Sequence, residues 1–99
     1  MPKTQTNGRI ATGRRGRPRD RVKQVLREAF RRAFPSDTVD ISDGYKGNIH
    51  VLVVSRKFDR MSEREKPAFM WRVIDSTDLI EDEKQLVSLV YPLSPAELK

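Results

Sequence analysis

Few side chains in this sequence are of the kinds that carry out catalysis or bind metal ions. The 99 residues include no cysteine and a single histidine, His50. Disulfides, thiolate zinc sites and a cysteine nucleophile are therefore excluded, and a histidine cluster cannot form. A histidine that acts as a general base needs a nucleophile or a metal beside it, and none can be assigned to His50. We expect a non-enzymatic protein with no metal site and no cofactor.

The cationic side chains are unevenly distributed along the chain. Residues 1–34 hold eleven Lys and Arg against two acids, a net charge of +9, whereas residues 35–99 hold nine against twelve, a net charge of −3. Charge asymmetry of this kind is typical of proteins with a polyanionic partner. The positive segment therefore predicts nucleic-acid binding, without distinguishing DNA from RNA.

The sharpest motif is the run Arg-Arg-Gly-Arg-Pro-Arg at residues 14–19. Its core resembles the AT-hook, a short motif that binds the DNA minor groove. Gly16 has no Cβ, so its backbone can lie deep in a narrow groove, and Pro18 restricts the backbone. Arg15 and Arg17 would enter an A·T-rich minor groove, where the negative potential is strongest.

The flanking cations Arg14, Arg19 and Arg21 would contact phosphates in the same interpretation. The alternative is a generic solubilising or polyanion-binding tail. The composition of residues 1–19 offers too little apolar surface to offset the entropy of ordering, so we expect a disordered basic arm followed by one domain over residues 20–99.

An amphipathic helix is the clearest element of the domain. Asp20 is a good N-cap, apolar residues recur with the helical period over 22–34, and the proline that follows ends the helix. The outer face carries Lys23, Arg27 and Arg31, which we expect to extend the nucleic-acid contact of the arm. A solvated helix face explains the same pattern.

The remaining elements alternate between sheet and helix. Strands are expected over 38–42 and 49–55, joined by a turn into an antiparallel hairpin. A second helix follows, with Ser62 and Glu65 at the spacing of a capping box. The last strand is expected over 85–91.

Two shorter helical segments complete the expected order. Residues 79–83 can add one turn before the last strand, and Ser94-Pro95-Ala96-Glu97 should start a final turn. The order α-β-β-α-(α)-β predicts an α+β fold in which one three-stranded sheet has its helices on one face.

The hairpin turn has the form Gly-x-x-Gly at residues 44–47. In KH domains such a loop clamps a nucleic-acid backbone between two helices, but here it lies between two strands and predicts an ordinary turn. Tyr45 and Lys46 at its tip could add a stacking and a phosphate contact. His50, just beyond it, is expected to be a half-exposed strand residue.

Several local strings occur in the order found in one known family. Residues 51–58 read as a strand that ends in Val-Ser, followed by two further residues and Phe58. Phe34-Pro35 precedes a strand, and Ser94-Pro95-Ala96-Glu97 lies where members of that family often have Thr-Pro-x-Glu. Over residues 21–98 the sequence resembles the BolA family. The resemblance implies a fold akin to type II KH domains and a role as an adaptor of monothiol glutaredoxins around a shared iron–sulfur cluster, or as a DNA-binding regulator.

The sequence departs from the BolA pattern where the family binds its cluster. The family's early second-helix Arg-His-Arg is replaced by Lys66, Pro67 and Ala68, and the turn at residues 43–48 holds neither Cys nor His. A glycine of the family pattern is replaced by Arg60. We therefore expect the BolA-like fold without cluster ligands.

A second hypothesis is a protein-interaction adaptor that partners a glutaredoxin-like protein. Its contact residues would be Lys66, Met70 and Trp71, with Trp71 as an interface anchor. The alternative for Trp71 is packing along the edge of the core. No apolar run approaches a membrane span or a secretory leader, so we expect no membrane association and a cytoplasmic location.

Overall fold

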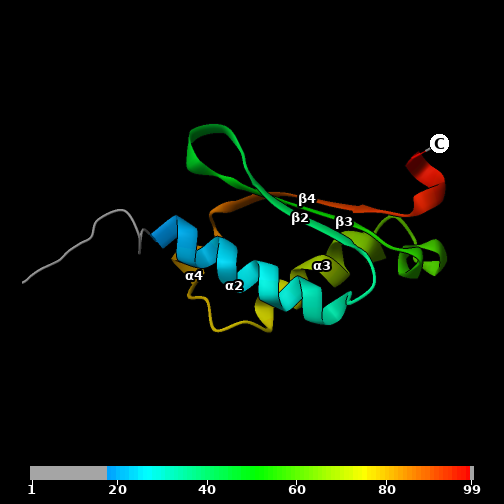
Figure 1. Cartoon of the computed structure of the whole chain (residues 1–99), viewed down its shortest axis with the longest axis horizontal. Coiled ribbons are helices and arrows are strands. Elements are labelled where there is room, and N and C mark those ends of the chain that lie inside the picture. The colour runs from blue at the N-terminus through cyan, green and yellow to red at the C-terminus, as the bar shows by residue number, and fades with distance from the viewer. Residues whose placement is uncertain (1–17, 99) are drawn as a thin grey trace, which may run out of the picture.

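The computed structural model describes residues 18–98, and its elements follow the expected order (Figure 1). The helices are α2 (Pro18–Ala33), α3 (Glu65–Asp75) and the short α4 (Glu81–Lys84). The strands are β2 (Thr38–Asp43), β3 (Ile49–Val54) and β4 (Val87–Leu93). Three 3₁₀ turns are η1 (Tyr45–Gly47), η2 (Arg56–Arg60) and η3 (Pro95–Leu98). The predicted α+β class and the α-β-β-α-α-β order are confirmed.

The three strands form one mixed sheet in the order β2-β3-β4. The β2–β3 hairpin is antiparallel, with Ile41 opposite Val51, as the turn sequence predicted. Strand β4 pairs with β3 in parallel, with Val90 opposite Val51. A parallel pair needs a crossover connection, and α3 and α4 lie in that connection.

The helices cover one face of the sheet (Figure 1). Alternate residues of β3 point into this layer, and Ile49, Val51 and Val53 are fully buried. From the helices, Leu26 of α2 and Ile74 of α3 are also fully buried against them. The two-layer arrangement follows because an amphipathic helix and a strand with period-two burial must each cover an apolar surface.

Aromatic rings close the core near the end of α2. Phe34 lies 5.5 Å from Phe58 and 5.6 Å from Phe69, measured between ring centroids, and Phe30 stacks on it at 6.4 Å. Lys57 donates a 2.7 Å hydrogen bond to the carbonyl of Ala33, which satisfies one of the free carbonyls at the helix end.

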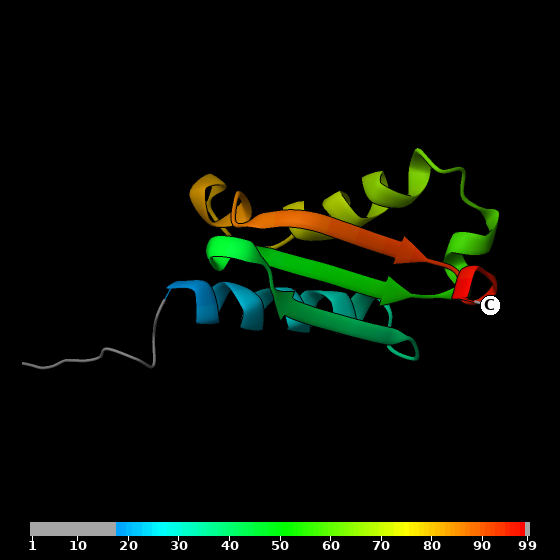
Figure 2. The same ribbon diagram turned by 90° about the horizontal axis from the view of Figure 1, so that it is seen from above.

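The opposite face of the sheet is uncovered within residues 18–98 (Figure 2). His50, Leu52 and Val54 of β3 lie half-buried on it. Leu89 and Tyr91 of β4 are 45% and 40% exposed. His50 is therefore the half-exposed strand histidine that was predicted.

Local capping signals were accurate predictors of the later turns. Glu65 accepts a 2.8 Å hydrogen bond from the Ser62 amide, and its own amide donates to the Ser62 hydroxyl at 3.1 Å. The Ser94 amide donates to Glu97 at 2.7 Å, which confirms the second predicted cap. Pro67 is the third residue of α3, in the first turn, where a missing N–H costs little.

The predicted start of α2 and both predicted ends of β4 are wrong by two or three residues. Helix α2 begins at Pro18, so Asp20 lies in its first turn and is not its N-cap. Proline is well suited to the first helical position, and an acid in the first turn still complements the helix dipole. Strand β4 begins at Val87 and ends at Leu93, because its pairing with β3 sets its ends.

Candidate nucleic-acid interface

Four of the predicted nucleic-acid contacts form one row along α2. Arg19, Lys23, Arg27 and Arg31 recur at intervals of four residues. Residues four apart lie on the same side of a helix, so the row runs along about 18 Å of its length. At its start the row faces the end of β2, because Arg19 and Lys23 both contact Asp43.

Arg21 lies apart from this row. Its guanidinium donates a 2.8 Å hydrogen bond to Glu83 of α4. The pair places Arg21 on the side of α2 that faces α4, away from β2. The AT-hook-like core precedes the described residues, so the predicted grouping of Arg21 with the cations around that core stays a prediction.

The first two cations of the row share one carboxylate. The Lys23 ammonium lies 2.9 Å from an Asp43 oxygen, and the Arg19 Nε lies 3.7 Å from the same oxygen. These pairs hold the β2–β3 hairpin against the first turns of α2. A phosphate would have to compete with Asp43 for both cations.

The last two cations of the row are differently placed. Within residues 18–98, no carboxylate lies within 4.0 Å of the guanidinium of Arg27 or Arg31. Arg27 donates only to the amide oxygen of Gln24, at 3.2 Å. Arg31 and its neighbour Arg32 are exposed in the last turn. These cations also complement the negative end of the helix dipole.

The most specific part of the sequence motif lies outside the described residues. Arg14, Arg15, Gly16 and Arg17 all precede residue 18. Pro18, the last residue of the AT-hook-like core, is the first residue of α2. The predicted arm therefore has no structural description here, and its motif stays a prediction.

The hairpin tip lies at the end of the molecule where α2 begins (Figures 1 and 2). The Gly-x-x-Gly segment is a turn, as predicted, and contains the 3₁₀ turn η1. Tyr45 is 77% exposed, and the Lys46 ammonium lies 5.5 Å from the centre of its ring. The sequence identified both residues but could not place them beside the start of α2.

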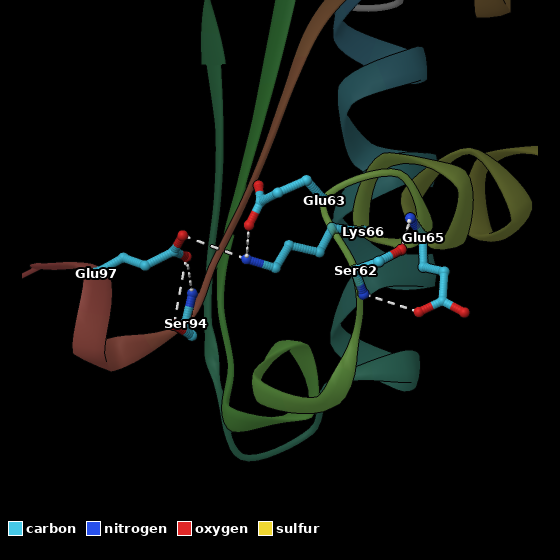
Figure 3. A network of polar contacts seen from close by, with 6 residues as sticks. All are labelled: Ser62, Glu63, Glu65, Lys66, Ser94 and Glu97. Carbon is cyan, nitrogen blue, oxygen red and sulfur yellow. Dashed lines mark hydrogen bonds and ion pairs between the residues drawn. The ribbon is translucent and has the colours of Figure 1, made fainter.

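Lys66 lies in an ion-pair cluster on α3 and is closed to a protein partner (Figure 3). Its side chain is only 7% exposed, and its ammonium donates to Glu63 at 2.9 Å and to Glu97 at 3.2 Å. The Glu63 carboxylate, helped by Glu97, raises the pKa of Lys66 against the opposing effect of burial. The Ser94 amide and Lys66 lower the pKa of Glu97. The cluster ties η3 to α3.

The other two predicted partner-binding residues do not form an exposed surface either. Met70 is fully buried in the core, so the prediction that it contacts a partner is wrong for this fold. Trp71 is half-buried and packs against the core, in agreement with the alternative interpretation. The error arose because a stripe of apolar residues on a helix does not reveal which of them reach the surface.

A small pocket lies between α2 and the turn after α3. Its volume is about 340 Å³, and its lining includes Glu28, Arg32 and Asp78 together with Ser76 and Thr77. The hydroxyls of Ser76 and Thr77 are engaged with the last carbonyls of α3. The remaining charges are of both signs, so the pocket presents no charge pattern that selects one class of ligand.

Residues 18–98 contain no group of three His, Cys, Asp or Glu side chains arranged to hold a metal ion. No helix in the same range is long and apolar enough to cross a membrane.

Comparison with known proteins adds no family assignment. Neither a protein-family model nor a curated protein nor a solved structure matches the chain significantly.

Proposed function

We propose that this chain is a non-enzymatic, BolA-like α+β domain that binds nucleic acid through its basic amino-terminal segment and α2. The observation that carries the proposal is the pair Arg27 and Arg31, two cations without carboxylate partners among residues 18–98. In the sequence they follow a segment, residues 1–17, that contains five Lys and Arg and no acid. Cations that serve no ion pair within the fold are suited to phosphates.

The mechanism is electrostatic. Each phosphate neutralised by a lysine or arginine releases condensed counterions, so affinity falls as the salt concentration rises. If the segment and α2 together meet about six phosphates, the logarithm of the binding constant for duplex DNA should fall with the logarithm of salt with a slope of about −5.

The experiment is a salt series of duplex binding by the full chain. Fluorescence anisotropy would be measured with A·T-rich and G·C-rich duplexes of equal length. We expect binding to both, with the steep salt dependence given above. Absent or salt-insensitive binding would refute the proposal.

Two variants assign the contacts. Changing Arg14, Arg15 and Arg17 to Gln removes three charges from the basic segment, and changing Arg56, Arg60 and Arg64 to Gln removes three exposed charges elsewhere. We expect only the first variant to weaken binding strongly.

The base preference separates the two interpretations of the motif. A preference for A·T-rich DNA that disappears with Arg17→Ala supports minor-groove binding of the AT-hook type. Equal affinity for both duplexes supports a general polyanion contact. Two of the three contact residues of the adaptor hypothesis, Lys66 and Met70, are buried, which argues against a partner surface on α3.

A further inference from the structure

The tip of the β2–β3 hairpin presents an aromatic ring and a cation side by side. Tyr45 is the most exposed of the large apolar or aromatic residues in the described chain, at 77%. The Lys46 ammonium lies 5.5 Å from the centre of its ring. An exposed ring beside a cation offers a nucleotide a surface for its base and a partner for its phosphate.

The conformation of the tip is unusual for its sequence. Lys46 has φ 55° and ψ 39°, in the left-handed region of backbone conformation. Residues other than glycine and asparagine rarely adopt this region. A glycine would fit this position without strain. A lysine kept in an unfavourable conformation suggests that its side chain serves a purpose other than the stability of the turn.

Contacts on both sides hold the tip in place. Gly44 lies so close to the His50 ring that a Cβ there would come within 2.3 Å of Nε2, and the His50 ring in turn meets the edge of Tyr91. The Gly44 amide donates a 2.6 Å hydrogen bond to the Asn48 carbonyl. These contacts hold the turn in one conformation and fix the direction in which its tip points.

The tip is also joined to the basic row of α2. Asp43, which precedes it, pairs with Lys23 and Arg19, and Gly47 lies beside the Arg19 guanidinium. Both views place the turn at the end of the molecule where α2 begins (Figures 1 and 2). A strand whose phosphates follow the start of the basic row of α2 would pass close to the tip.

We propose that Tyr45 stacks on an unpaired base while Lys46 contacts the adjoining phosphate. The inference rests on the proposed nucleic-acid binding and adds its substrate class: strands with unpaired bases, bound more tightly than the corresponding duplex. A paired base offers no free face within a duplex, so the stacking contact discriminates between the two.

The test uses the full chain and three labelled probes of one sequence: single-stranded DNA, single-stranded RNA and the DNA duplex. We expect Tyr45→Ala to weaken single-strand binding about tenfold and duplex binding less than twofold. Each unpaired base that stacks on an aromatic side chain adds to the affinity, and a paired base cannot stack in this way. Tyr45→Phe keeps the ring and should retain wild-type affinity. The DNA and RNA arms identify which strand is preferred.

A second readout reports stacking directly. The fluorescence of 2-aminopurine placed in the single strand should be quenched on binding to the wild type and to Tyr45→Phe, but not to Tyr45→Ala. Lys46→Gly should raise the melting temperature, because it relieves the strained backbone, and should weaken single-strand binding about threefold.

The outcomes distinguish a failure of the stacking inference from a failure of the proposed nucleic-acid binding on which it rests. If the wild type binds none of the probes, both fail. If it binds them and Tyr45→Ala leaves single-strand affinity unchanged, or weakens single strand and duplex equally, stacking is refuted and general nucleic-acid binding stands.

Discussion

In the first half of α2, Arg19, Arg21 and Lys23 pair with carboxylates of β2 and α4, whereas Arg27 and Arg31 in the second half pair with none among residues 18–98. The two halves carry similar side chains with different surroundings. The paired cations attach neighbouring elements to the helix, and the unpaired cations remain available to an external anion. A charge count over the whole helix would treat both alike.

The largest expected effect comes from removing the unpaired cations. Arg27→Gln with Arg31→Gln should weaken duplex binding about tenfold at low salt and reduce the salt slope by about 2, because two phosphate contacts are lost. The free energy of unfolding should change by less than about 0.5 kcal/mol, as is usual for surface substitutions. Anisotropy and urea denaturation measure the two quantities.

The matched control removes two paired cations of the same row. Arg19→Gln with Lys23→Gln should change duplex affinity less than threefold and should lower stability more than the first variant does. Equal losses of affinity in both variants would show that pairing does not distinguish the two halves.

A smaller effect of opposite sign is expected when the shared carboxylate is neutralised. Asp43→Asn should raise duplex affinity about threefold, because Arg19 and Lys23 no longer have a competing anion. The hairpin should also open more often, which hydrogen exchange at the Gly44 amide can detect. Unchanged affinity together with unchanged exchange would contradict this account.

The ion-pair cluster that joins α3 to η3 should make the stability of the fold depend on pH in acid. The Ser94 amide and Lys66 lower the pKa of Glu97, so its carboxylate stabilises the fold above its unfolded pKa and this contribution is lost as pH falls. The loss should begin below about pH 4.5. Glu97→Gln removes this titration, so its unfolding free energy should fall less steeply in acid than that of the wild type. The unfolding free energy of both proteins would be measured by denaturant unfolding at several acid pH values. If it falls equally steeply with pH in both, this prediction is refuted.

The smallest effect is expected for the exposed pair on the other side of α2. Arg21→Gln breaks the contact with Glu83, and such exposed pairs contribute about 0.2–1 kcal/mol. Duplex affinity should stay within twofold, because Arg21 lies outside the row. A loss of affinity as large as that of the Arg27 and Arg31 variant would return Arg21 to the interface.

Sequence patterns with local causes were the most reliable predictors of the fold. The helical period over 22–34, the hairpin turn and the caps at Ser62 and Ser94 all depend on residues close together in the chain, and each is present in the structure. The exact start of α2 and the ends of β4 were less predictable. Helix ends depend on small energy differences, and strand ends depend on a partner strand.

Within the candidate interface, the sequence by itself determined the basic row, because a spacing of four residues on a helix defines a side. The tertiary structure alone decided which cations are paired. Asp43 reaches Lys23 across twenty residues, and Glu83 reaches Arg21 across sixty-two. Similarly, the sequence predicted that Lys66 and Met70 contact a partner, but both are buried because α3 packs against the sheet. Charge and periodicity are local properties of a chain, whereas pairing and burial depend on which distant segments the fold brings together.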